Sequence, residues 1–203
     1  MSRKTAALQR FDTDFHVYNR GVDKQTIFFR PADYNLFLSL MESSLNNDLV
    51  SLLVYCLMPN HFHLIIRQFK PYAISDFMKA VCETFAKTIN QRRKRCGHLF
   101  GSRFKIAPLS DPATLLRTSH YVHSNPVSAG LSASPSAWLY SSYTEYVSTN
   151  LIGFVHTERI LDLIGGYEKY AQFMEEFNPA RPQSLRKFLP PETTTPRASI
   201  LLR

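Results

Sequence analysis

Residues 50–67 read VSLLVYCLMPNHFHLIIR, two largely apolar runs separated by Pro59-Asn60. Two such runs joined by a two-residue break are typical of a β-hairpin. Side chains alternate between the two faces of a strand, so His61 and His63 are expected to share one face of the second strand. The residues expected on its opposite face are Phe62, Leu64 and Ile66. The stretch therefore predicts a hairpin that carries a pair of histidines beside its turn.

Strands and helices are also expected on both sides of this hairpin. The segment from Phe15 to Gly21 is rich in β-forming residues and stops at glycine, which predicts a strand. Apolar residues recur at three- and four-residue steps after Pro31, and again from Ile74 to Ile89. This spacing predicts two helices that each bury one face. A further strand is expected through Ile106 and Leu109.

A third helix is expected to begin at Asp111-Pro112, with Asp as N-cap and Pro in the first helical position. It should end at Asn125, because the residue before Pro126 avoids helical geometry. The order is then strand, helix, strand, strand, helix, strand, helix. This order favours an α+β fold, namely a ferredoxin-like or RRM-like antiparallel sheet backed by helices.

The two ends of the chain differ in composition from its middle. Residues 1–10 are expected to form a loose basic tail and residues 11–148 the main domain. The aromatic-rich stretch Trp138–Tyr146 is expected to pack back onto that domain, because aromatic residues at such density usually fill a core. Residues 149–180 predict a small C-terminal helical extension. Residues 181–203, rich in Pro, Thr, Ser and Arg, predict a flexible tail.

The charge of the chain favours a polyanionic partner. It has 203 residues, with 24 Lys and Arg against 16 Asp and Glu, a net charge of +8 and a pI near 9.5. Nucleic acid is the favoured polyanion, since no apolar run is long enough to span a bilayer. Charge serving solubility alone remains an alternative. No signal peptide is recognised, and three widely spaced cysteines favour reduced thiols inside a cell. These are Cys56, Cys82 and Cys96.

Tyr121 and Asn125 are four residues apart in the third expected helix, so they share a face. If that face meets the histidine pair, the result is a divalent-metal site with two imidazoles, one amide oxygen and a phenol beside it. An amide oxygen suits Mg²⁺ or Mn²⁺ better than a catalytic zinc. Such a site fits transfer of a phosphodiester onto protein. Alternatively, His61 and His63 hydrogen-bond to their neighbours or face solvent.

A basic segment with interspersed aromatic residues follows the second expected helix. Its cations are expected to contact phosphates and its aromatic rings to stack on unpaired bases. The residues are Arg92, Arg93, Lys94, Arg95, Arg103 and Lys105, with Phe100 and Phe104. The alternative for the first four is a solvated run of charge. His123 lies on a different helix face from Tyr121, so we expect it to be structural or to contact DNA rather than to bind metal.

Four blocks of sequence carry a resemblance to a known family. They are residues 57–66 around the histidine pair, 97–104 (GHLFGSRF), 121–127 (YVHSNPV) and 138–143 (WLYSSY). Together and in this order they resemble the single-tyrosine HUH transposases, in particular the REP-associated tyrosine transposase branch. The resemblance extends from about residue 11 to residue 148.

The resemblance implies an HUH endonuclease core that recognises a single-stranded DNA hairpin, then nicks and rejoins one strand beside it. By this match Tyr121 is the nucleophile and forms a 5′-phosphotyrosine intermediate, and His61, His63 and Asn125 hold Mg²⁺ or Mn²⁺. Related enzymes include monomers and dimers, so either a monomer or a homodimer is expected. The implied location is the cytoplasm of a prokaryotic cell, in association with the nucleoid.

Two alternatives belong to other functional classes. A domesticated transposase would retain the fold as a non-catalytic protein that binds hairpin DNA or RNA. An RNA-binding ferredoxin-like domain would carry exposed aromatic residues on its strands. The second alternative is disfavoured, because the expected strands carry His, Tyr and Asn at those positions.

Overall fold

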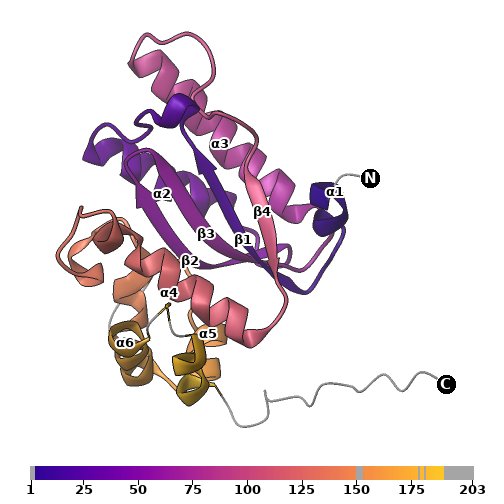
Figure 1. Ribbon diagram of the computed structural model, residues 1–203. Coiled ribbons are helices and arrows are strands. Elements are labelled where there is room, and N and C mark those ends of the chain that lie inside the picture. The colour runs from indigo at the N-terminus through magenta and orange to yellow at the C-terminus, as the bar shows by residue number, and fades with distance from the viewer. Residues whose placement is uncertain (1–2, 150–152, 178, 181, 190–203) are drawn as a thin grey trace.

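Four antiparallel strands form one sheet in the order β2-β3-β1-β4 (Figure 1). The computed structural model describes residues 3–149, 153–177, 179–180 and 182–189. The strands are β1 (Thr13–Arg20), β2 (Val50–Met58), β3 (His61–Gln68) and β4 (Lys105–Leu109). This order, with a helix between β1 and β2 and another between β3 and β4, is the split βαβ arrangement of the predicted ferredoxin-like fold.

Helices cover both faces of the sheet. Helices α2 (Pro31–Ser44) and α3 (Ala73–Arg92) pack on one face. Helix α4 (Pro112–Ser128) packs on the other, with α5 (Glu158–Ile164) and α6 (Tyr167–Glu176) beyond it. Short 3₁₀ turns lie at Val22–Lys24, Pro135–Ala137, Ser142–Tyr146 and Pro182–Phe188. In the part of the chain that the structure describes, no helix has the length and apolarity needed to span a membrane.

The alternation predicted for β3 is confirmed. Phe62, Leu64 and Ile66 belong to the core cluster under α2 and α3, while Ile65 belongs to the cluster under α4. Because both faces of the sheet are covered, every residue of β2 is buried. The expected packing of the aromatic-rich stretch is also confirmed, since Tyr146 is fully buried and donates a hydrogen bond to the Leu53 carbonyl oxygen at 2.7 Å.

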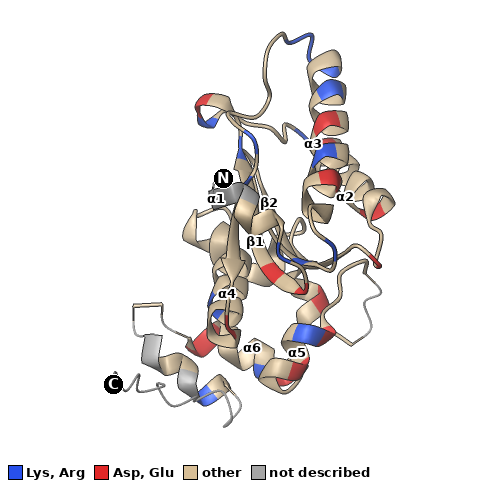
Figure 2. Ribbon diagram, turned by 90° about the vertical axis from the view of Figure 1, so that its right-hand side faces the viewer, with Lys and Arg blue, Asp and Glu red and all other residues tan. Residues whose placement is uncertain are grey.

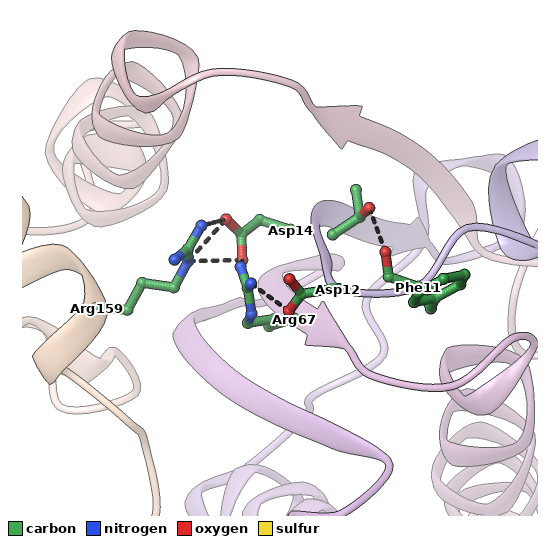
Figure 3. A network of polar contacts seen from close by, with 6 residues as sticks. Phe11, Asp12, Asp14, Arg67 and Arg159 are labelled. Carbon is green, nitrogen blue, oxygen red and sulfur yellow. Dashed lines mark hydrogen bonds and ion pairs between the residues drawn. The ribbon is translucent and has the colours of Figure 1, made fainter. Parts of the chain in front are cut away.

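The C-terminal helices are tied to the sheet by an ion-pair network (Figure 3). Asp14 on β1 is 4% exposed and accepts hydrogen bonds from Arg67 on β3 and from Arg159 on α5. Arg159 Nη2 lies 2.6 Å from Asp14 Oδ2, and Arg67 also pairs with Asp12. A carboxylate this deeply buried requires such partners. The predicted helical extension is therefore packed against the same sheet as the main domain.

Three predictions about chain ends and helix bounds were wrong. Part of the expected N-terminal tail is helix α1 (Arg3–Leu8), because Leu8 is buried in the core. Part of the expected C-terminal tail is the 3₁₀ turn at Pro182–Phe188, whose Leu185 and Phe188 are buried. Residues 190–203 lie outside the described part. Finally, α4 does not end before Pro126.

Pro126 lies inside α4, which continues to Ser128. A proline removes one backbone hydrogen bond from a helix and strains the preceding turn. Here only the last turn is affected, and Pro126 is buried. The Ala129 amide still donates to the Asn125 carbonyl oxygen at 3.0 Å, so the helix closes normally after the proline. Tertiary packing thus overrides the local preference of the residue before proline.

Candidate active site

The histidine pair and Tyr121 lie next to each other between the sheet and α4. His61 and His63 are on β3, with ring centroids 5.0 Å apart. The Tyr121 ring of α4 lies edge-on to the His63 ring at 5.2 Å. His63 is buried, whereas Tyr121 is 50% exposed. The predicted nucleophile therefore sits beside the predicted metal ligands, with its ring open to solvent.

Asn125, one turn after Tyr121 on α4, reaches the same site and hydrogen-bonds to His61 through its side chain. The His61 ring is also held by Asn60, whose Oδ1 lies 2.6 Å from His61 Nδ1. Asn60 in turn donates from Nδ2 to the Lys24 carbonyl oxygen at 3.0 Å, so the hairpin turn is itself fixed. All four residues predicted for the chemistry are thus brought together.

His16 is a member of the site that we did not predict from the sequence. It lies on β1, and its Nε2 is 2.9 Å from His63 Nδ1. Its ring stacks on that of His63, with 5.1 Å between centroids. The only signal in the sequence is alternation, because the polar residues Asp14, His16 and Tyr18 alternate with the buried Phe15 and Val17. Which residues of the neighbouring strands they meet depends on the register of the sheet.

Two further β1 residues border the site. The Tyr18 ring lies 4.9 Å from that of His16 and 5.8 Å from that of His63, centroid to centroid. Arg20 pairs in register with His61 and is exposed. An exposed guanidinium in this position can form bidentate hydrogen bonds to a phosphate group. From the sequence alone we assign no role to Tyr18 or Arg20.

Burial keeps the imidazoles of the site neutral at physiological pH. Burial, followed by the neighbouring His16, His61 and Arg20, lowers the pKa of His63 to about 2. Burial lowers the pKa of His16 to about 4. Burial and Arg20 also lower the pKa of His61, which the Asn125 hydrogen bond partly opposes. A neutral imidazole keeps one lone pair, as metal binding requires.

The donor set fits a divalent metal ion. Both His61 and His63 are held through Nδ1, so the Nε2 atom of each can act as a ligand. For His63 this requires that Nδ1 carry the proton and donate it to His16 Nε2. Asn125 contributes an amide oxygen, a hard ligand suited to Mg²⁺ or Mn²⁺. Among the described residues, no three His, Cys, Asp or Glu side chains form a metal site, so the fit depends on Asn125.

His123 is buried on the opposite side of α4 from the site. Its Nδ1 lies 2.8 Å from the Tyr170 hydroxyl of α6, and its Nε2 lies 2.9 Å from Ser142 Oγ. The Tyr55 amide of β2 donates to the same Ser142 Oγ at 2.9 Å. Burial, and to a lesser extent His120, lowers the pKa of His123 to about 3. The structural alternative for His123 is therefore the one that the geometry supports.

The arginines at the end of α3 contact other parts of the protein. Arg92 lies 3.7 Å from the buried carboxylate of Asp33, and the Arg93 guanidinium lies 3.8 Å above the centre of the Phe29 ring. Arg95 donates to the Gln25 side chain at 3.3 Å. Lys94 is exposed in the turn that follows, and Figure 2 shows cations gathered at this end of α3.

The remaining predicted DNA-contacting residues lie around the start of β4. Arg103 and Lys105 are exposed, and Phe104 is half-buried. Phe100 packs against the core, with its ring 6.0 Å from that of Phe62. Phe104 also packs against this core, so of these four residues only Arg103 and Lys105 are exposed.

Comparisons with known proteins bear on the family and the fold of this chain. The family model described as "Transposase IS200 like" matches residues 9–125. A REP-associated tyrosine transposase bound to a REP hairpin is similar in fold, with a TM-score of 0.56 and 14% identity over 78% of this chain and 93% of that one. A candidate transposase from Deinococcus radiodurans R1 has a TM-score of 0.41 and 15% identity over 56% of this chain and 90% of that one. No curated protein matches the sequence.

Proposed function

The chain belongs to the family of IS200-like transposases, and from this premise we propose that it is a metal-dependent single-stranded DNA endonuclease and strand transferase. It cuts one strand next to a hairpin and forms a 5′-phosphotyrosine intermediate at Tyr121. The observation that carries this proposal is the position of the half-exposed Tyr121 ring, whose centroid lies 5.2 Å from that of the buried, neutral His63 ring. A nucleophile open to solvent beside a neutral pair of imidazoles suits attack on a bound phosphodiester.

The reaction exchanges one phosphoester bond for another. Tyr121 Oη attacks the scissile phosphorus and loses its proton, while the bond from phosphorus to the 3′ oxygen breaks. The leaving 3′ oxygen takes up a proton, so the products are a 5′-phosphotyrosine and a free 3′-hydroxyl. Because the new ester retains the bond energy, a second 3′-hydroxyl can reverse the step without ATP.

The residues around Tyr121 prepare this step. His61 and His63, steadied by Asn60 and His16, would hold the metal ion together with Asn125. A divalent ion there would offset the charge that develops on the phosphate oxygens. Arg20, exposed beside the same strand, would bind a non-bridging oxygen of the phosphate.

The test is adduct formation on hairpin oligonucleotides taken from repeats near the gene. With Mg²⁺ or Mn²⁺ present, a fraction of the protein should migrate with covalently attached DNA on a denaturing gel. Tyr121→Phe should abolish the adduct, and EDTA should prevent it. Tyr18→Phe is the matched control, because Tyr18 is the other tyrosine whose ring lies near His63.

An adduct that persists in Tyr121→Phe would overturn the assigned nucleophile, and its loss in Tyr18→Phe alone would transfer that role to Tyr18. Binding of hairpins without any adduct would favour the alternative of a domesticated, non-catalytic protein. The proposed DNA partner and the expected reduced thiols support action at the nucleoid of a prokaryotic cell. Tyr121 approaches the histidines of its own chain, which supports catalysis within a single chain, whether monomeric or dimeric.

A further inference from the structure

A groove of about 1060 Å³ runs along β4 beside helix α1. Figure 1 shows α1 lying next to this edge strand, which pairs only with β1 among the described strands. The groove is lined by three cations, two aromatic rings and small or aliphatic side chains. The cations are Arg10, Arg103 and Lys105, and the rings are Tyr18 and Phe104.

This groove begins at the active site. Tyr18 lines it and also lies against His16 and His63. Lys105 pairs in register with Tyr18, so the two side chains share the face of the sheet that carries His63. A chain that leaves the active site along β4 therefore passes Lys105 first.

The charge of the groove distinguishes it from a neighbouring cavity. That cavity, of about 360 Å³, is lined by Asp12, Asp14 and Asp111 together with two arginines, so it offers a polyanion no excess of positive charge. The groove along β4 has no acidic residue in its described lining. In the described ranges, the side chains of Arg103 and Lys105 take part in no ion pair. Their charge is thus not neutralised within the protein.

From these observations we propose that the groove binds the unpaired DNA strand that continues from the scissile phosphate. A groove with cations and aromatic rings is the usual chemistry of single-stranded nucleic-acid binding, in which cations follow the phosphates and rings stack on bases. Arg10, Arg103 and Lys105 contact the phosphates, and Tyr18 and Phe104 contact the bases. The inference rests on the proposed function, because it assigns the strand held at the active site a path across the protein.

The test measures binding rather than cleavage, in a Tyr121→Phe background and without divalent metal. Fluorescence anisotropy compares a bare hairpin with the same hairpin carrying an unpaired flank of about eight nucleotides on its 5′ or its 3′ side. The double variant Arg103→Glu, Lys105→Glu should lose at least about tenfold affinity for one flanked hairpin. It should lose less than about twofold for the bare hairpin. Lys79→Glu, an exposed cation on α3, is the matched control and should not distinguish the DNAs.

Equal losses on flanked and bare hairpins, or no loss on any of them, would overturn the groove assignment. Circular dichroism establishes that each variant is folded, and Lys105→Ala provides a milder version of the change. A flank-specific loss of affinity, with no covalent adduct formed by the wild-type protein, would support the groove assignment and contradict the proposed catalysis. Adduct formation by the wild type without a flank-specific loss would support the catalysis and contradict the groove assignment.

Discussion

The two faces of helix α4 differ sharply in solvent exposure, although the residues that represent them are only two positions apart. Tyr121 is 50% exposed and faces the histidine pair, whereas His123 is fully buried between Tyr170 and Ser142. One face carries the exposed phenol of the candidate site. The other face is hydrogen-bonded to α6 and to the turn at Ser142–Tyr146, which is itself hydrogen-bonded to β2. The comparison indicates that the buried face fixes the helix so that the open face can place its phenol.

The support of each face comes from a different region of the chain. The buried face depends on the C-terminal extension, which supplies Tyr170. The open face depends on the sheet, where His16 and Asn60 hold the two histidines. Substitutions on the buried face should therefore act mainly on stability, and those on the open face on metal binding and catalysis.

His123→Ala should have the largest effect on stability. It removes one buried hydrogen bond from Ser142 and one from Tyr170 and creates a cavity, so the free energy of unfolding should fall by about 2–4 kcal/mol. Urea denaturation measures the change. Tyr121→Phe removes one hydroxyl from a half-exposed ring and should stay within about 0.5 kcal/mol of the wild type. Similar losses of unfolding free energy for the two variants would contradict the proposed difference between the two faces of α4.

His16→Leu should weaken metal binding about tenfold to a hundredfold, because the Nδ1 proton of His63 loses its acceptor. His16→Gln should recover much of this affinity, since its amide oxygen can accept the same proton. Electron paramagnetic resonance of Mn²⁺ titrations provides the dissociation constants. Equal weakening by Leu and Gln would show that His16 fills space rather than orienting His63.

Stability should fall as the pH is lowered from about 6.5 toward 3. The pKa of His123 is lowered to about 3 by burial, so below 6.5 the unfolded chain binds a proton that the folded chain does not. This single group contributes at most about 1.4 kcal/mol per pH unit. Urea denaturation at pH 7, 6 and 5 should show a shallower fall for His123→Gln. An identical pH dependence would mean that His123 is not neutral in the folded protein.

Arg93→Ala should have the smallest effect. Loss of its contact with the Phe29 ring should reduce the free energy of unfolding by about 0.5–1 kcal/mol. Hairpin affinity should change less than about twofold, because this guanidinium is engaged within the protein. A loss of affinity as large as that expected from the β4 groove would restore Arg93 to the DNA interface.

Local sequence signals predicted much of the fold. Apolar periodicity located α2 and α3, and the Pro59-Asn60 break located the hairpin, because both depend on residues close together in the chain. The same signals failed at Pro126, where burial of the proline outweighs local preference. They also failed at residues 182–188, whose buried Leu185 and Phe188 are too widely spaced to mark an element.

The candidate site divides in the same way. The spacing of His61 with His63, and of Tyr121 with Asn125, is a property of the chain itself, since strand and helix geometry put each pair on one face. His16 is different, because a single histidine in a strand has no spacing to mark it. It joins the site only because β1 lies beside β3 in a register that brings it to His63.

The sequence by itself determined which side chains could carry the chemistry, the elements that bear them and the positive charge that favours a nucleic acid. Only the tertiary structure decided which of them meet. Strand register brought His16 to His63, the C-terminal helices enclosed His123, and packing against α2 engaged Arg92 while Lys105 stayed exposed. The physical reason is that local conformation follows from neighbouring residues, whereas the partner of a side chain depends on segments brought together by burial of the shared core.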